Sequence, residues 1–196
     1  MGKTIFNMSV SLDGFVARPD GDVGQLFKWY HSGDTEVTLP GPELVFKVSR
    51  ASAELFRKTW PAVGAVVTGR RNFEYAHGWD GKPPGGVPHF VVTHTVPAQW
   101  AQPGSPFTFV TDGIESAVRQ AQAAGGGKDI AISTANVMQQ CLRAGLLDEL
   151  HVDLVPVLLG EGIRLFEQGG PAPVELEIIH VIEGAGVTHL AYRVVK

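Results

Sequence analysis

The sequence predicts an α/β domain whose central sheet is mainly parallel and becomes mixed at one edge. Three observations support this prediction. Short apolar runs alternate with segments of helical spacing through the middle of the chain. Residues that start and end helices separate these segments. At the C-terminus, two strand-like segments, 175–183 and 187–195, flank a Gly-Ala-Gly connector that suits an antiparallel hairpin.

Six further segments have the composition of strands. The first alternates between two sets of side chains, and the others are short apolar runs. These predicted strands cover residues 3–11, 62–68, 89–93, 107–111, 128–133 and 150–155.

Four segments have helical character and connect these strands. The predicted helices cover residues 43–60, 69–78, 114–124 and 135–143. We expect Asp112 and Thr134 to cap the last two helices at their N-termini. Glycines at 125–127 and at 145 would end them. Residues 33–42 are expected to form an inserted loop.

The composition is typical of a folded globular domain. The chain has 196 residues, of which 44% are hydrophobic and 18% are charged, and this size predicts one domain over residues 1–196. Its net charge of −4 does not favour nucleic-acid binding. No apolar run reaches the roughly 20 residues of a membrane span, and the N-terminus lacks the apolar core of a signal peptide. Cys141 is the only cysteine, so we expect a cytoplasmic protein without internal disulfides.

Polar and basic residues follow four of the predicted strands. They are Ser11 and Asp13, then Gly69, Arg70 and Arg71, then Thr93 and His94, and finally Ser133 and Thr134. In open α/β sheets, ligands bind outside the carboxyl ends of the strands. Backbone N–H groups at helix N-termini and two guanidinium groups suit a ligand with several phosphates, such as a dinucleotide. Ordinary helix capping with two solvent-exposed arginines explains the same residues equally well.

Other kinds of site have less support in the sequence. None of the seven histidines belongs to a close metal-binding motif, so we expect no metal. The glycines at 125–127 follow a helix and precede a strand, which is the wrong order for a phosphate-binding loop. Trp29 and Tyr30 follow the first loop. They either pack in the core or line a pocket for a flat substrate or a nicotinamide ring.

Several motifs follow one another along the chain. They are SVSLDGFVA at 9–17, TGRRNFE at 68–74, VVTHT at 91–95, GLLDEL at 145–150 and PVLLGEGIRLF at 156–166. In this order they resemble the dihydrofolate reductase-like family over nearly the whole chain. The chain is most similar to the stand-alone group that resembles the C-terminal reductase domain of bifunctional riboflavin-biosynthesis enzymes. The resemblance implies a three-layer α-β-α fold with a mixed, mainly parallel sheet.

The resemblance also implies an NADPH-dependent reductase of a small-molecule substrate, which forms a homodimer. Its cofactor site would draw on several strand ends. The adenosine-side phosphates would be held by Gly69, Arg70 and Arg71, and the 2′-phosphate would be bordered by Thr93 and His94. The pyrophosphate would be held by Ser133, Thr134, Ala135, Asn136 and Val137. The nicotinamide would be lined by Val10, Val16 and Ala17, and the cleft would be closed by Leu158 and Gly160.

Asp13 is the catalytic candidate, because the reduction needs a proton donor and Asp13 is the best titratable group at the expected pocket. A turn-capping aspartate explains this residue at least as well, and a bound water could supply the proton instead. Ser11, Trp29 and Tyr30 complete the expected substrate side.

The chain departs from the family pattern at four places. Ser133-Thr134 stand where the family has two glycines or Gly-Ser, and their side chains either crowd a pyrophosphate or donate to it. Ile132 stands for a glutamate and Phe15 for a lysine, which removes polar groups from the substrate side. His94 stands for an arginine and is only partly charged at neutral pH, which weakens selection for the 2′-phosphate.

The leading hypothesis is hydride transfer from NADPH to a C=N or C=O group of a small, flat heterocycle. The alternative is a non-catalytic dimer that binds a nucleotide or another small ligand on the same fold. Ser133-Thr134 and the apolar Phe15 motivate this alternative. A dimeric scaffold without any ligand explains the strand-end residues least well.

Overall fold

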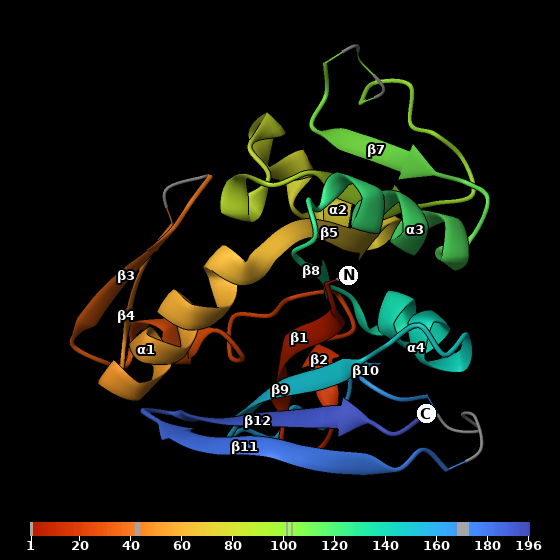
Figure 1. Cartoon of the computed structure of the whole chain (residues 1–196). Coiled ribbons are helices and arrows are strands. Elements are labelled where there is room, and N and C mark those ends of the chain that lie inside the picture. The colour runs from red at the N-terminus through yellow and green to blue at the C-terminus, as the bar shows by residue number, and fades with distance from the viewer. Residues whose placement is uncertain (1, 42–43, 101, 103, 168–172) are drawn as a thin grey trace.

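The computed structural model describes residues 2–41, 44–100, 102, 104–167 and 173–196. In this part of the chain, the main sheet has eight strands. They are β1 (Thr4–Ser11), β5 (Val63–Gly69), β6 (His89–Val92), β7 (Phe107–Val110), β8 (Asp129–Ile132), β9 (Glu149–Val155), β11 (Leu176–Gly184) and β12 (Val187–Val194). Their order across the sheet is β11-β12-β9-β1-β8-β5-β6-β7 (Figure 1).

The six strands from β9 to β7 run parallel to one another. β12 pairs antiparallel with β9, and β11 pairs antiparallel with β12. This arrangement confirms the prediction of a mainly parallel sheet with a C-terminal antiparallel hairpin at one edge. Parallel neighbours need crossover connections, which is why most of the helices lie between strands in the sequence.

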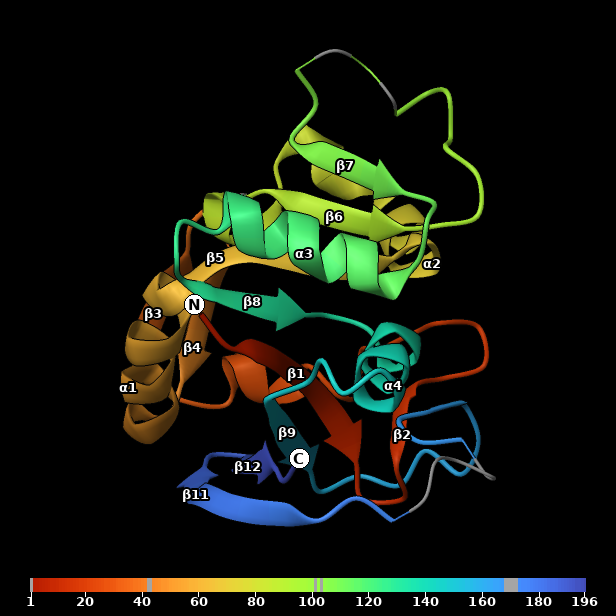
Figure 2. The ribbon, with the colours of Figure 1, turned by 45° about the vertical axis from the view of Figure 1, so that its right-hand side comes forward.

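Helices cover both faces of the sheet, which confirms the three-layer architecture (Figure 2). The helices are α1 (Arg50–Thr59), α2 (Arg70–Tyr75), α3 (Ile114–Ala124) and α4 (Ala135–Arg143). On one face, Val118 of α3 and Met138 of α4 belong to the same buried cluster as Phe6 of β1. On the other face, Phe73 of α2 packs with Val91 of β6.

Short elements surround this framework. β2 (Phe15–Ala17) pairs antiparallel with β10 (Ile163–Arg164), and β3 (Thr35–Leu39) pairs antiparallel with β4 (Leu44–Val48). Four 3₁₀ helices connect larger elements, namely η1 (Lys28–His31), η2 (Trp60–Ala62), η3 (His77–Gly81) and η4 (Pro84–Gly86). No helix in the described residues combines the length and the apolarity that a membrane crossing requires.

The β3–β4 hairpin corrects two predictions. The expected loop 33–42 contains β3, and the first part of the expected helix 43–60 is β4. Pro42 and Glu43 lie outside the described residues. The apolar residues at 44, 46 and 48 alternate with the period of a strand, a pattern that the helical interpretation overlooked.

Helix α1 begins only after Ser49. The Oγ atom of Ser49 accepts a hydrogen bond from the backbone N–H of Ser52 at 3.2 Å, which is an N-terminal cap. The predicted helix 69–78 is also shorter than expected, since α2 ends at Tyr75 and His77 has a φ of 48°. This left-handed conformation cannot continue an α-helix.

The predicted cap of α3 is wrong. Gly113, not Asp112, occupies the N-cap position, with a φ of 103° and no side-chain capping bond. Only glycine adopts such a conformation readily, so the backbone fixes this helix start. Thr134 is the N-cap residue of α4, as predicted, but its side chain makes no capping bond either.

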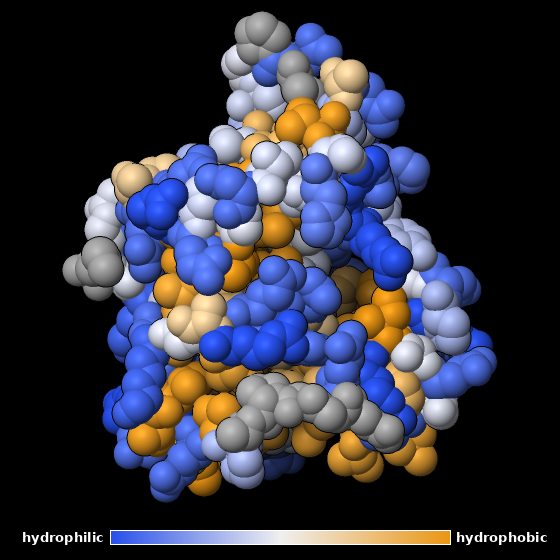
Figure 3. All heavy atoms as spheres, turned by 90° about the vertical axis from the view of Figure 1, so that its right-hand side faces the viewer, coloured by the Kyte–Doolittle hydropathy of each residue, from blue (hydrophilic) through white to orange (hydrophobic). Residues whose placement is uncertain are grey.

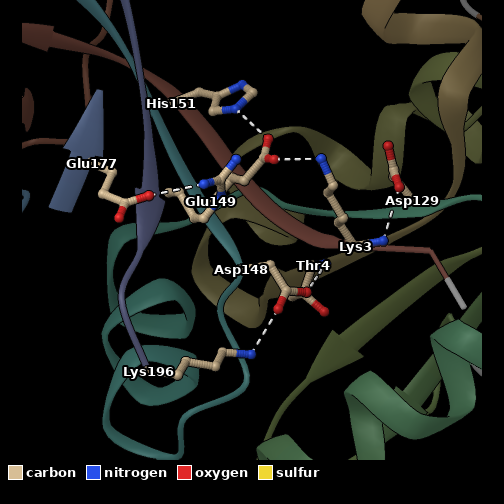
Figure 4. A network of polar contacts seen from close by, with 9 residues as sticks. Lys3, Thr4, Asp129, Asp148, Glu149, His151, Glu177 and Lys196 are labelled. Atoms are coloured by element: carbon tan, nitrogen blue, oxygen red, sulfur yellow. Dashed lines mark hydrogen bonds and ion pairs between the residues drawn. The ribbon is translucent and has the colours of Figure 1, made fainter. Parts of the chain in front are cut away.

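Ion pairs join the strands at the edge of the sheet where β1 and β9 begin (Figure 4). Lys3 Nζ lies 2.6 Å from Glu149 Oε1, and His151 Nε2 lies 2.9 Å from the other carboxylate oxygen of Glu149. Lys196 Nζ lies 2.7 Å from Asp148 Oδ1. Glu149 is buried and is engaged by both Lys3 and His151, whereas the pair of Lys196 with Asp148 is exposed and contributes at most about 1 kcal/mol.

Candidate functional site

The carboxyl ends of β1, β8, β5 and β6 meet at one edge of the sheet, because these strands are parallel neighbours. The polar residues predicted from the sequence therefore converge there, as expected for an α/β ligand site. Figure 3 looks at the side of the molecule toward which the arrowhead of β7 points in Figure 1. Hydrophilic side chains cross the middle of this side, and hydrophobic side chains are visible in hollows beside them.

Helix α4 presents its N-terminus at this edge. The first helical hydrogen bond runs from Met138 N to Thr134 O at 2.9 Å, so the N–H groups of residues 135–137 have no partner within the helix. The side chains of Ala135 and Val137 are buried in the core, so only their backbone is available to a ligand. These N–H groups and the helix dipole form an anion-binding position.

The hydroxyl of Thr134 lies beside this position. Thr134 Oγ1 is buried and has no hydrogen-bond partner within the described part of the chain. A Cβ atom placed on Gly69 would lie 3.2 Å from this oxygen, so the hydroxyl points toward the end of β5. Buried hydroxyls are normally satisfied, and a phosphate oxygen would satisfy this one. The residues present therefore fit a pyrophosphate, and the threonine offers a donor where the family pattern has glycine.

The guanidinium group of Arg70 makes hydrogen bonds to neighbouring residues of the chain. Its Nε donates to Glu74 Oε1 at 2.8 Å, and its Nη1 donates to Thr95 Oγ1 at 2.6 Å. Thr93 Oγ1 donates to the backbone oxygen of Thr95 at 2.8 Å. Arg70 and Thr93 therefore fix the shape of the turn at 93–95.

Arg71 and His94 have different surroundings from Arg70. Both side chains are exposed, on segments that directly follow β5 and β6. Because β5 and β6 pair side by side, the two segments are neighbours at the strand-end edge. Of the three basic residues predicted here, Arg71 and His94 are the exposed ones, whereas Arg70 is half-buried.

The carboxylate of Asp13 joins two strand-end loops, an arrangement that we term the Asp13 clasp. Its Oδ1 accepts hydrogen bonds from Ser11 Oγ at 2.6 Å and from Leu159 N at 3.2 Å, and its Oδ2 accepts one from Gly160 N at 2.8 Å. Ser11 Oγ also accepts a hydrogen bond from Phe15 N at 2.9 Å. The turn after β1 and the loop after β9 are thereby held together.

The clasp determines the protonation state of Asp13. The hydrogen bond from the Ser11 hydroxyl, together with the backbone N–H groups of Gly160 and Leu159, holds the pKa of Asp13 below its usual value. The carboxyl group is therefore ionised at neutral pH and has no proton to donate. This geometry favours the structural interpretation of Asp13 over its role as the proton donor.

The residues expected to line a nicotinamide lie where the first strand ends. Val10, Val16 and Ala17 are buried, and β2 carries the latter two beside β1. Leu158 is 69% exposed and lies in the clasped loop next to Gly160, whose φ of 77° favours glycine.

Trp29 lies in the core. It is 1% exposed, and its indole Nε1 donates to Ser9 Oγ at 3.1 Å. Tyr30 stacks on Trp29 with ring centroids 4.2 Å apart and lies 4.5 Å from the ring of Phe46. The burial of Trp29 contradicts the expectation that it lines a pocket. Tyr30 belongs to the same aromatic cluster, and burial raises the pKa of its hydroxyl, so it is not an acid at neutral pH.

Sequence reasoning missed a cation near the start of β2. The guanidinium carbon of Arg164 lies 4.7 Å from the centre of the Phe15 ring, within the range of a cation–π contact. The chain has Phe15 where the family pattern has a lysine, but Arg164 brings a positive charge close to this position. No local signal predicts this contact, because it depends on the pairing of β10 with β2.

Two cavities of the described residues lie away from this edge. One, of about 340 Å³, is lined by Phe56, Trp60 and Lys128 among others. The other, of about 310 Å³, lies beside the ion pairs of Lys3 and Glu149. Both are near the amino ends of the strands, so neither coincides with the strand-end site.

Comparison with known proteins gives a consistent result. The sequence matches the model of the RibD C-terminal domain over residues 3–190. It is 23% identical over 177 residues to YwjB, an uncharacterised protein of Bacillus subtilis (strain 168), and this match covers 85% of this chain and 83% of YwjB.

Solved structures share the fold. A putative riboflavin biosynthesis protein from Shewanella sp. PV-4 superposes with a TM-score of 0.74 at 21% identity and covers 99% of both chains. The riboflavin biosynthesis reductase Rib7 of Saccharomyces cerevisiae superposes with a TM-score of 0.61 at 14% identity and covers 99% of this chain and 90% of its own.

Proposed function

The chain belongs to the RibD C-terminal domain family, and on this basis we propose that it is a reductase that transfers a hydride from NADPH to a small molecule. The observation that carries the proposal is the anion-binding position at the start of α4. Free N–H groups, the unpartnered hydroxyl of Thr134 and the glycine at 69 converge there. This combination suits a pyrophosphate at the carboxyl edge of a parallel sheet.

Different residues of this edge would contact different parts of the cofactor. The N–H groups of residues 135–137 and the hydroxyl of Thr134 would hold the pyrophosphate. Arg71 and His94 would contact the 2′-phosphate, while Arg70 keeps the turn at 93–95 in place. Val10, Val16 and Ala17 would border the nicotinamide, which supplies the hydride when the cofactor is bound.

The substrate would lie between the start of β2 and the clasped loop 157–160. We propose a small, flat heterocycle that presents a C=N or C=O group to the hydride. Arg164 favours a substrate that also carries a carboxylate or phosphate, since its guanidinium group is exposed beside Phe15. Asp13 contributes by holding the wall of the site, and the proton comes from solvent.

A second copy of the chain is proposed to cover β11. This strand lies at the edge of the sheet, and Ile178 and Val181 on it are 70% and 58% exposed. Exposed apolar edge strands pair with other chains unless they are covered. Sedimentation equilibrium of the purified protein tests the homodimer, and the variant Ile178→Glu would shift it to monomer. A wild-type monomer at micromolar concentration would contradict this assignment.

NADPH binding followed by NADPH oxidation tests the function. We expect NADPH to quench or enhance tryptophan fluorescence with saturation, and the variant Arg71→Gln to weaken binding. The variant Lys128→Gln, at the opposite edge of the sheet, is the matched control and should bind as the wild type does. Absence of binding would refute the proposal.

The non-catalytic alternative makes a different prediction. Asp13, the titratable group expected at the pocket, is committed to the clasp, which is the observation that favours this alternative. NADPH would then bind tightly but stay unoxidised with carbonyl, imine and pterin compounds, including those with an anionic group. Oxidation with any of them would favour the reductase.

A further inference from the structure

The cavity of about 340 Å³ at the amino ends of the strands takes no part in the proposed reductase site. We call it the hairpin cavity, because residues 37, 38 and 40, in and just after β3, form one of its walls. The other walls come from the end of α1, from η2 and from the residues that precede β6 and β8. The cavity and the strand-end site therefore lie at opposite edges of the sheet.

Two hydrogen bonds tie β3 and the residue after it to the rest of the molecule. Arg57 Nη2 donates to the backbone oxygen of Glu36 at 3.2 Å, and Gly85 N donates to Pro40 O at 2.7 Å. Between these two points β3 also packs against α1, beside which it lies in Figure 1. The cavity is therefore a space whose outer wall is bound at both ends.

The lining of the hairpin cavity is mainly apolar and aromatic. Phe56 is 5% exposed and Trp60 is half-buried, and their rings stack with centroids 4.5 Å apart. The side chains of Val37, Val63 and Val87 complete the apolar lining. Small-molecule sites are typically concave, mostly apolar and about 300–1,000 Å³ in volume. A flat aromatic ring would bury its surface against these side chains.

Two cations also line the cavity, namely Arg57 and Lys128, and both side chains are exposed. Lys128 Nζ donates to the backbone oxygen of Pro61 at 3.0 Å, so both cations are bound to neutral carbonyl groups. Within the described residues, neither forms an ion pair with a carboxylate. The carboxylate of Glu36 pairs with Lys47 instead, at 3.6 Å. Carbonyl groups do not neutralise a cation, so the cavity attracts an anionic group.

We propose that the hairpin cavity is a second ligand site, which binds a small aromatic acid. The ring of the ligand lies against Phe56 and Trp60, and its carboxylate or phosphate group faces Arg57 and Lys128. The β3–β4 hairpin provides the outer wall of this site. The inference goes beyond the proposed reductase and does not depend on it, because no residue of the strand-end site lines this cavity.

The probe is 2-naphthoate, which combines a flat ring with one carboxylate, and 2-naphthamide is its neutral counterpart of the same shape. Binding is followed by NMR through the indole N–H signal of Trp60, which is identified as the signal that the variant Trp60→Phe lacks. We expect 2-naphthoate to shift this signal with saturation and a Kd of about 1 mM or tighter. The amide should bind about 3- to 10-fold more weakly, because it carries no charge for the two cations.

Variants test the two cations. The double variant Arg57→Gln with Lys128→Gln should raise the Kd of 2-naphthoate about 3- to 10-fold and leave that of 2-naphthamide unchanged. The matched control is Lys58→Gln, because Lys58 is an exposed lysine of α1 that does not line the cavity. It should bind both probes as the wild type does. The comparison of acid and amide in the wild type needs no variant, so it holds even if the double variant is less stable.

Three results would overturn the inference. They are an unmoved Trp60 signal, equal affinity of the wild type for acid and amide, and displacement of 2-naphthoate by NADPH, which would put the probe at the strand-end edge. We expect saturating NADPH to leave the Kd of 2-naphthoate unchanged. If the wild type binds 2-naphthoate at Trp60 but binds no NADPH, the proposed function fails and the second site stands.

Discussion

The variant Asp13→Asn distinguishes a clasp from a proton donor. Asparagine has the same shape and keeps an Oδ1 acceptor for Ser11 Oγ and Leu159 N. At the other position, it presents an amide NH₂ group to the N–H of Gly160, which the carboxylate accepts at 2.8 Å. This hydrogen bond is lost, and two donors face each other instead.

The size of the effect follows from the bond that is lost. The hydrogen bond between this carboxylate and the backbone N–H of Gly160 is charge-assisted but exposed to solvent, so its loss should weaken the closed loop by about 3- to 10-fold. Because this loop borders the cleft, the Kd of NADPH and the KM of the substrate should both rise by about this factor. The kcat at saturation should fall by less than about 3-fold, since no proton passes through Asp13.

The assay combines a fluorescence titration with NADPH and the rate of NADPH oxidation with an accepted substrate. The variant Asp34→Asn, an exposed carboxylate of the β3–β4 region, is the control and should match the wild type. A loss of general-acid catalysis would instead lower kcat by about 10²- to 10⁴-fold and leave the Kd of NADPH unchanged. That result would refute the clasp.

Three further predictions concern other parts of the molecule. Burial lowers the pKa of His89 to about 4, because the folded state disfavours the charged imidazole. The free energy of unfolding therefore keeps its full value above the usual histidine pKa of 6.5 and decreases as the pH falls from 6.5 toward 4. Denaturant unfolding should show a loss of about 2 kcal/mol between pH 7 and pH 5, which the variant His89→Phe should not show. His94→Ala should reduce the preference for NADPH over NADH several-fold in titrations with both nucleotides, because the side chain proposed to contact the 2′-phosphate is removed. Trp29→Phe should destabilise the fold by about 1–3 kcal/mol, because Ser9 loses its buried partner, and an unchanged denaturant midpoint would contradict the packing role of Trp29.

The sequence could predict the elements whose signals are local and repeated. The strand ending at Ser11 alternates between two sets of side chains, and the strands ending at Gly69 and Val92 are short apolar runs. Polar residues follow all three, and their ends converge as the parallel topology requires. The sequence does not separate β4 from α1, because the alternating apolar residues at 44–48 are followed directly by the helical spacing of apolar residues after Ser49. An α-helix and a strand share such apolar positions over a few residues.

The chemistry of single side chains was harder to predict. Asp13 has the same neighbours in the sequence whether it donates protons or caps a turn, and only its contacts with Leu159 and Gly160 separate the two roles. Trp29 could line a pocket or fill the core, and its hydrogen bond to Ser9 depends on tertiary packing. The hydrogen bond from the hydroxyl of Tyr75 to the backbone oxygen of Asp20 likewise joins segments that no sequence pattern connects.

A thermal-shift titration of the wild type with NADPH and NADH tests whether the strand-end edge binds NADPH. A ligand at 100 times its Kd stabilises the folded state by about 2.7 kcal/mol, which raises the melting temperature by roughly 5–10 °C for a chain of this size. We predict such a shift with NADPH and a smaller one with NADH at the same concentration. No shift with either nucleotide would contradict the account, because the N-terminus of α4 and the hydroxyl of Thr134 would then not form a dinucleotide site.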